Sequence, residues 1–375
     1  MKVHAFWLAL CLGLVVSCTG KTDRIAELPV IGIGQQIEEP AEVPLRDIAS
    51  SVEIIQLETS DSLLLPAIYK LHVFDKYLLV DGLLFERSGK FLNRVFRTGE
   101  GPEEVFKGAN VVQVREGKVY VLDFAGAVKV FSLDGRWLKT VKSPANTYFD
   151  FYPLDGERFA GFKSNFKGTE KNCIEFFDAD GVLAAIPYTR QYEPKASWFA
   201  PGEGKFFQTA DGLLLKRLLC DTIFRVDSKK HLLRPAYRID FGKWASKESR
   251  RYEYQSMEEL QNMLFTEMPM VTFLGQGNDY LAFTTVFTDM GKQRMMYGTN
   301  LYNLRSGSAR SLMLKYSDED LKVLGEDGDA MPDFIKGASG DYFFPKVMSA
   351  DGRSLVSWRQ QANDRNPLVI IATLK

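Results

Sequence analysis

The chain has 375 residues, of which 45% are hydrophobic and 25% charged, and its 47 basic side chains nearly balance its 48 acidic ones. This length is enough for one large or two ordinary domains, and the balanced charge argues against nucleic acid as a partner. Phenylalanine and tyrosine are abundant, with 27 and 15 copies. Because aromatic side chains favour pleated, half-buried surfaces, the composition favours an all-β protein.

The first residues read as a secretory signal. Lys2 precedes an apolar run over residues 5–16, too short to span a bilayer, and Ser17 and Cys18 follow it. The stretch "VVSC" at 15–18 resembles a bacterial lipobox, in which the cysteine becomes the lipid-modified first residue. We therefore expect a lipoprotein signal peptide over 1–17. The alternative is an ordinary signal peptide that contains a cysteine by chance.

Lipidation of Cys18 would hold the chain in the cell envelope, on the outer membrane, on either its periplasmic or its surface side. The lipid anchor is the only membrane contact that we expect. Residues 18–46 mix proline, glycine and glutamate without a clear period, which is typical of an extended linker. The folded domain is then expected to cover residues 47–375.

One phrase recurs in this domain: a strand, a tight turn and another strand. It occurs at 84–92, 130–138 and 176–184, and the turn glycines Gly89, Gly135 and Gly181 are spaced 46 residues apart. Further copies start at Ile223 and Leu301. A last one, from Val347, has an Asp-Gly turn that joins a different pair of strands. A second type of strand precedes several copies, at 76–82, 117–126, 156–163 and 278–285.

A period in the forties with about four short strands per repeat predicts a six-bladed β-propeller over 47–375. A β-sandwich with similar hairpins does not explain the regular spacing. A propeller closes by completing one blade with strands from both chain ends, because an open ring leaves an unpaired edge. We therefore expect residues 51–58 and 367–375 to belong to one sheet.

Residues 243–265 interrupt the repeat between the fourth and fifth blades. Ser256 and Glu259 have capping-box spacing, and Met257, Leu260 and Leu264 fall on one helical face. We expect a short inserted helix, which either covers a blade edge or forms the rim of a binding face.

Cys173 and Cys220 are the two cysteines that follow Cys18, and they occupy equivalent positions in neighbouring repeats. Equivalent positions in adjacent blades are usually too far apart for a disulfide, so both thiols are expected to be free.

The stretch "RTGEGPEEVF" at 97–106 lies where the outermost strand of one blade must cross to the innermost strand of the next. Gly99 and Gly101 allow a positive φ or a close approach there, and Pro102 fixes the direction of exit. Without a Lys-Ser/Thr ending or a βαβ unit this is no phosphate-binding loop. Arg97, Glu100 and Glu104 are nevertheless candidates for a polar site, alongside the simpler interpretation as a structural corner.

Five segments together resemble the six-bladed, NHL-like β-propeller lipoproteins of Bacteroidetes: 89–106, 119–138, 220–227, 235–243 and 366–375. Family members carry a Gly-x-Gly-Pro-Gly-Glu-aromatic corner. This sequence differs at Glu103, where the family usually has glycine, and at Val105, where it usually has an aromatic residue. The resemblance implies the propeller architecture and no particular ligand or reaction.

Few residues point to chemistry. His72 and His231 fall in different blades, and no Cys-x-x-Cys or His-x-x-x-His pair exists, so no metal site of that kind is predicted. Asp81, Asp123 and Asp279 follow or flank inner strands. They are either turn residues or ligands for a hard cation in the channel.

Aromatic side chains offer a different route to function, because sugar rings and apolar peptides stack on exposed rings. The candidates in or near loops are Trp198, Trp244, Tyr252, Tyr254 and Trp358. The alternative is that these aromatic side chains pack between blades, as many aromatic residues of propellers do.

Two functions follow. The first is a non-enzymatic binding or scaffold protein, without a cofactor and acting as a monomer, for a glycan, a peptide or an envelope protein; Trp198 and Trp244 are its aromatic candidates. The alternative is a hydrolase or lyase, similar to gluconolactonases, that uses a divalent cation such as Ca²⁺ in the propeller channel. Its catalytic residues cannot be named from the sequence.

Overall fold

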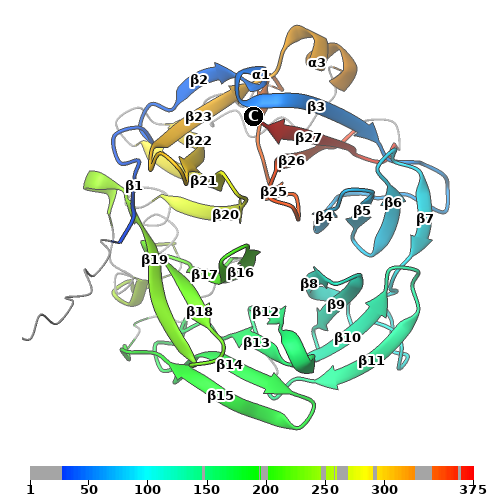
Figure 1. Cartoon of the computed structure of the whole chain (residues 1–375), viewed down its shortest axis with the longest axis vertical. Coiled ribbons are helices and arrows are strands. Elements are labelled where there is room, and N and C mark those ends of the chain that lie inside the picture. Colours follow the sequence, from blue (N-terminus) through cyan, green and yellow to red (C-terminus); the bar gives the residue numbers. More distant parts are fainter. Residues whose placement is uncertain are drawn as a thin grey trace, which may run out of the picture.

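The computed structural model describes residues 28–145, 148–193, 195, 202–245, 251–256, 258–259, 269–289, 294–325, 340–361 and 365–375. The described strands form six sheets arranged as blades around a central axis (Figure 1). The predicted six-bladed β-propeller is confirmed.

The first three blades follow one another along the chain. Blade 1 contains β4 (Leu71–Val73), β5 (Tyr77–Val80), β6 (Leu83–Glu86) and β7 (Phe91–Arg94). Blade 2 contains β8 (Ala109–Arg115), β9 (Lys118–Asp123), β10 (Ala127–Ser132) and β11 (Trp137–Lys142). Blade 3 contains β12 (Asp150–Pro153), β13 (Phe159–Phe162), β14 (Asn172–Asp178) and β15 (Gly181–Pro187).

The other three blades include strands from the N-terminal part of the chain. Blade 4 contains β16 (Gly204–Thr209), β17 (Gly212–Arg217), β18 (Thr222–Asp227), β19 (Leu232–Asp240) and β1 (Val30–Gly32). Blade 5 contains β20 (Met270–Gln276), β21 (Tyr280–Asp289), β22 (Arg294–Asn303), β23 (Ala309–Lys315), β2 (Ala41–Pro44) and β24 (Tyr342–Phe343). Blade 6 contains β25 (Val347–Met348), β26 (Ser354–Arg359), β27 (Leu368–Leu374) and β3 (Ala49–Gln56).

The recurring turn glycines have the same place in each blade. Gly89, Gly135 and Gly181 lie between the third and fourth strands of blades 1 to 3, and all three have positive φ values. Gly352 lies instead between β25 and β26, the first two strands of blade 6. This confirms that the last copy of the phrase joins a different strand pair.

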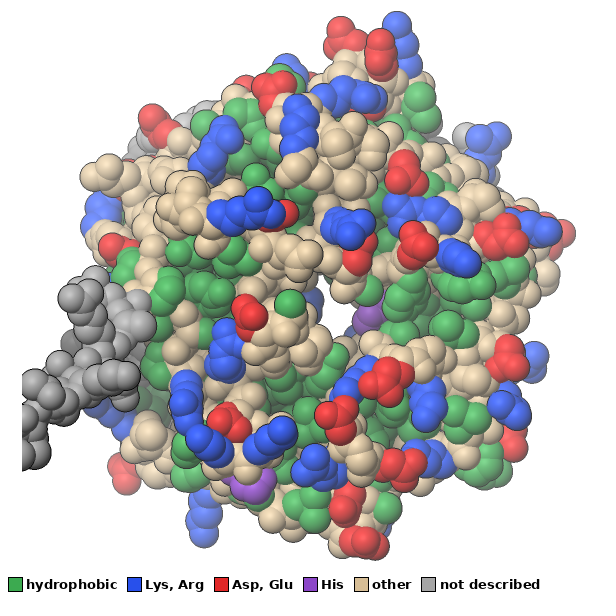
Figure 2. Space-filling view, in the orientation of Figure 1, with side chains coloured by type: hydrophobic (Ala, Val, Ile, Leu, Met, Phe, Trp, Pro, Cys, Tyr) green, Lys and Arg blue, Asp and Glu red, His purple; other side chains and the backbone are tan. Residues whose placement is uncertain are grey.

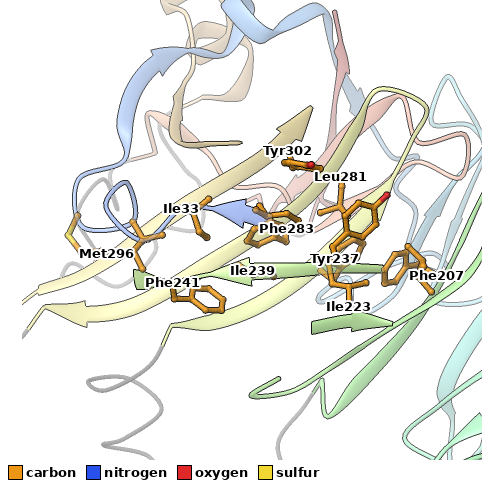
Figure 3. Packing of buried hydrophobic residues seen from close by; sticks show 14 residues of the cluster. Ile33, Phe207, Ile223, Tyr237, Ile239, Phe241, Leu281, Phe283, Met296 and Tyr302 are labelled. Atoms are coloured by element: carbon orange, nitrogen blue, oxygen red, sulfur yellow. The ribbon is translucent and has the colours of Figure 1, made fainter. Parts of the chain in front are cut away.

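Within the described residues, six large hydrophobic clusters form the core, each between the facing surfaces of two adjacent blades. Alternation along a strand divides its side chains between two clusters. In β5, Leu78 and Val80 pack toward blade 6, whereas Leu79 packs toward blade 2. The middle strands are therefore buried on both faces, and their sequences are continuous runs of apolar residues. Figure 3 shows the cluster between blades 4 and 5, where Phe207 stacks on Phe273 with ring centroids 3.8 Å apart.

Both chain ends build blade 6. β27 lies between β26 and β3 and pairs with β3 in antiparallel register, with Ile370 opposite Ile54. The predicted pairing of the two terminal segments is confirmed. The ring is thereby closed by hydrogen bonds between residues more than 300 positions apart in the sequence.

Part of the segment expected to be an extended linker belongs to the propeller. β1 pairs in parallel with β19, the outer strand of blade 4, and β2 pairs in parallel with β23 of blade 5. The chain thus runs along the outer edges of blades 4 and 5 before it enters β3, the outer strand of blade 6 (Figure 1). Ile31, Ile33 and Ile37 are buried between blades 4 and 5. Burial of these side chains stabilises the segment. Its pairing with the outer strands of blades 4 and 5, whose edges would otherwise be unpaired, stabilises it further.

Helical structure is sparse in the described part of the chain. α1 (Leu45–Ile48) joins β2 to β3, and α3 (Asp318–Leu324) follows β23 in the connection between blades 5 and 6. Two 3₁₀ turns, η1 (Asp155–Glu157) and η2 (Gly242–Trp244), lie in blade 3 and after β19. None of the described helices is long and apolar enough to cross a membrane.

Of the inserted helix expected between blades 4 and 5, residues 258–259 are described and helical. Glu259 N donates to Ser256 Oγ at 3.1 Å, and Gln255 N donates to Glu259 Oε2 at 2.8 Å. The first contact matches the expected N-cap at Ser256, whereas the Glu259 carboxylate accepts from the residue before the N-cap. Met257, Leu260 and Leu264 lie outside the described residues.

Both described cysteines are free, as the repeat register predicts. Cys173 lies in β14 of blade 3, and Cys220 precedes β18 of blade 4.

Candidate functional site

A cavity of about 1280 Å³ runs along the axis of the ring and is lined by residues from the inner strands of all six blades. Figure 2 shows its opening near the centre of one face. Each blade has its strands in the same order and direction, so the starts of the inner strands lie together at one end of the channel. We call this end the mouth; the loops that join the second and third strands of the blades lie at the same end.

Polar contacts near the axis join neighbouring blades. The carboxylate of Asp150, on β12, accepts hydrogen bonds from Phe206 N of blade 4 at 2.6 Å and from Gln113 Nε2 of blade 2 at 3.4 Å. Ala350 N donates to Val73 O at 2.9 Å and so connects blades 6 and 1. Asp150 therefore links three blades at once. Burial raises its pKa to about 6, against the opposing effect of these hydrogen bonds and of Lys205.

Three of the basic residues that line the cavity lie at the starts of inner strands. Lys70 precedes β4, His72 lies on β4 and Lys205 is the second residue of β16. Burial lowers the pKa of both lysines, and Lys70 further lowers that of Lys205. Burial, with the added effect of Lys205 and Lys70, lowers the pKa of His72 to about 4. The imidazole is therefore neutral at pH 7.

Aromatic rings surround the mouth. Tyr69 is 78% exposed at the start of blade 1, and Phe124 is 59% exposed in the turn between β9 and β10. Phe149 and Phe166 of blade 3 meet edge to face with centroids 5.7 Å apart. All four residues line the cavity. Aromatic side chains gathered around one cavity offer apolar faces against which another molecule can pack.

The inserted segment lies at the same end of the channel. Arg251 forms a bidentate ion pair with Glu203, with two N–O distances of 2.9 Å, and both side chains are buried. Tyr252 stacks on Tyr192 and donates a hydrogen bond to Asn165 O at 2.8 Å. The insertion is thus fixed to the loops of blade 3 that line the mouth. None of the insertion's described residues is among those that line the cavity, so both alternatives, a rim and a cover for a blade edge, stay open.

The corner at 97–106 has a structural role. Its connection from β7 to β8 is the predicted crossing between blades. Val105 N donates to Arg97 O at 2.8 Å, and the Glu104 carboxylate accepts a hydrogen bond from Gly101 N at 2.9 Å. A side chain at position 99 would collide with that carboxylate, so Gly99 permits a close approach, without a positive φ. Val105 is fully buried between blades 1 and 2.

The predicted binding residues are dispersed. Arg97 and Glu100 are exposed, and with Glu104 they lie at the corner, which is not among the described lining of the channel. Trp244 packs against the cluster between blades 4 and 5, and its Nε1 donates to Glu38 Oε1 at 3.1 Å. Trp198 lies outside the described residues. The structure therefore does not bring these five residues together as one described site, and a ligand role for any of them stays a prediction.

Of the three carboxylates considered as cation ligands, Asp81 and Asp123 hold turns together, and Asp279 pairs with Arg305 at 2.6 Å. Asp81 accepts hydrogen bonds from Tyr69 N and Lys70 N, at 2.9 and 2.8 Å. Asp123 accepts from Ala125 N and Ala127 N. Within the described ranges, no group of three or more His, Cys, Asp or Glu side chains is placed to hold a metal ion. These contacts agree with the turn interpretation and offer no argument for a Ca²⁺ site.

Sequence reasoning did not find the channel residues. Lys70, His72, Asp150 and Lys205 each lie at the start of an inner strand, but they are isolated polar residues in different repeats. Only an alignment of the repeats on their inner strands would show that these four residues lie at the same level along the channel axis. The predicted aromatic candidates also missed Tyr69 and Phe124, because the sequence does not show which loops border the channel.

The fold has relatives among solved structures. A crystal structure from Bacteroides fragilis NCTC 9343, of a protein named "Putative exported protein", is 14% identical to the chain, with a TM-score of 0.63 over 92% of this chain and 99% of that one. The WD40 propeller domain of Doa1 is 12% identical, with a TM-score of 0.41 over 88% of this chain and 97% of that domain. At these identities the first likeness shows the fold alone.

No curated protein matches the sequence. A family model described as a domain of unknown function, DUF4934, matches residues 28–369, which begin ahead of β1 and end within β27. The match covers strands of all six blades together with the N-terminal strands along blades 4 and 5. The chain therefore belongs to the DUF4934 family.

Proposed function

We propose that this protein is an exported, lipid-anchored binding protein whose ligand, a glycan, enters the mouth of the propeller channel. The observation that carries the proposal is the pair of large exposed rings, Tyr69 and Phe124, beside a cavity of about 1280 Å³. Sugar rings can pack their apolar faces on such side chains. The cavity is large enough to admit several sugar units.

The location of the protein is a separate part of the proposal. The signal-like residues 1–17 and the lipobox-like Cys18 support export and attachment to the outer membrane, as in the NHL-like lipoproteins that the sequence resembles. The similar Bacteroides fragilis protein is also named as exported. The tether would join the propeller at the outer edge of blade 4, where the described chain begins.

A glycan array tests the binding function. We expect the wild-type protein to retain a subset of glycans and the double variant Tyr69→Ser, Phe124→Ser to bind them at least about tenfold more weakly, equivalent to about 1.4 kcal/mol. Leu183→Ser is a matched control, because Leu183 is an exposed apolar residue on the outer strand of blade 3. Absence of glycan retention, or retention unchanged in the double variant, would overturn the proposal.

A further inference from the structure

The channel contains two half-buried lysine side chains that approach from opposite sides. Lys70 belongs to blade 1 and Lys205 to blade 4, which face each other across a ring of six (Figure 1). Both line the cavity. They are close enough to interact electrostatically: burial lowers the pKa of Lys205, Asp150 raises it, and the charge of Lys70 lowers it further.

The two ammonium groups are incompletely paired. Lys205 Nζ donates one hydrogen bond, to Phe273 O at 3.3 Å. Lys70 Nζ has neither a hydrogen bond nor an ion pair with the described residues. An ammonium group carries three donors, so this pair has several that remain available to a ligand.

The nearby carboxylates are committed to other groups. Asp81 accepts hydrogen bonds from two backbone amides at the start of β4, and Asp150 from the amides of Phe151 and Phe206. Asp150 attracts both lysines and Asp81 attracts Lys70, in each case without an ion pair. Since a cation away from water is costly without a close counter-charge, the site favours an anion from outside the chain.

The rings at the mouth define the remainder of the ligand. Tyr69 is adjacent in sequence to Lys70, and Phe124 lies in the next blade around the ring. A molecule that contacts both rings and the lysines needs an apolar face directly beside an anionic group. A sugar acid has both, because its carboxylate is attached to the ring itself.

We propose that the channel binds an acidic saccharide, with the carboxylate of a uronate between Lys70 and Lys205 and the sugar rings against Tyr69 and Phe124. This inference rests on the proposed glycan-binding function and names its ligand class. His72, neutral and adjacent, is placed to exchange hydrogen bonds with the sugar hydroxyls.

Isothermal titration calorimetry with a galacturonate oligosaccharide and a neutral galactose oligosaccharide of the same length tests the inference. We expect the acidic probe to bind at least tenfold more tightly, and its affinity to fall with rising salt. Lys70→Gln and Lys205→Gln should each weaken it at least tenfold, whereas Lys70→Arg should retain most of the affinity. Lys142→Gln, at an exposed position on the outer strand of blade 2, is the matched control and should change nothing.

The outcomes separate the two proposals. Equal affinity for the neutral probe, or unchanged binding by both Lys→Gln variants, overturns the acidic ligand and leaves the glycan-binding function standing. A poly-glutamate peptide that competes for the same lysines with higher affinity overturns the saccharide in favour of an acidic peptide. If neither saccharide binds, the acidic-saccharide inference is wrong, and the glycan array alone decides the binding function. Thermal unfolding of each variant confirms that the ring is intact, and Lys70→Gln alone suffices if Lys205→Gln does not fold.

Discussion

Arg251 and Glu203 form a buried, bidentate ion pair that attaches the insertion between blades 4 and 5 to the mouth of the channel. Their side chains are 5% and 1% exposed. Ser164 Oγ donates a further hydrogen bond to the same carboxylate at 2.6 Å. Few charged pairs in the described structure are as completely buried. This ion pair therefore holds the insertion in place, and we expect a substitution of either residue to be destabilising.

Arg251→Ala should therefore be strongly destabilising. It leaves the Glu203 carboxylate buried without its counter-ion, and breaking such a pair costs roughly 3–5 kcal/mol. Urea unfolding followed by circular dichroism measures the loss. Arg305→Ala is the matched control: Arg305 pairs with Asp279 at 2.6 Å but is 80% exposed, so its removal should cost at most about 1 kcal/mol. Equal effects of the two substitutions would contradict the structural role assigned to the buried pair.

Deletion of residues 367–375 should abolish cooperative folding. These residues form β27, which lies between β26 and β3, and Val369 and Ile371 are fully buried. The deletion opens the ring and removes several core side chains, each worth roughly 2–5 kcal/mol against a total stability of about 5–15 kcal/mol. Differential scanning calorimetry, with deletion of Lys375 alone as the control, checks this. A truncated chain that melts cooperatively near the parent temperature would show that the ring does not need β27.

The pH dependence of stability should contain a contribution from His72. Burial, reinforced by Lys205 and Lys70, lowers its pKa from 6.5 to about 4 in the folded state. Between these values the unfolded chain binds more protons, so this contribution to stability rises with pH from about 4 to 6.5, by up to about 3 kcal/mol. The difference in unfolding free energy between wild type and His72→Gln should show the rise. A difference that stays constant across this window would mean that His72 is not buried as described.

Cys18→Ala should move the protein from the membrane fraction to the soluble fraction in its native host. The melting temperature of the propeller should not change, because Cys18 precedes β1, the first strand of the ring. Fractionation and immunoblotting measure the distribution. Membrane retention equal to that of the wild type would contradict lipidation at this cysteine.

The architecture was predictable because it is repeated. A tight turn with Gly89 recurs at Gly135 and Gly181, and each copy marks the same position in a blade. β1 was missed because it has only three residues, and a period of two cannot be recognised over so short a run. Its order comes from the outer edge of blade 4, which no local pattern reveals.

The candidate site was not predictable for a different reason. Lys70 and Lys205 are separated by more than a hundred residues, and each alone resembles an ordinary surface lysine. They face one channel only because closure of the ring places blades 1 and 4 opposite each other. Glu100 and Glu104 were candidates because they are close together in the sequence. Which side chains share a site is determined instead by the closure of the ring.

The most direct test of the proposed ligand is a crystal structure of the protein with a galacturonate oligosaccharide. The account predicts electron density in the channel, with one carboxylate within about 3 Å of the ammonium groups of Lys70 and Lys205 and a sugar ring against Tyr69 or Phe124. Density on the outer edge of a blade, or an empty channel at saturating ligand, would contradict it.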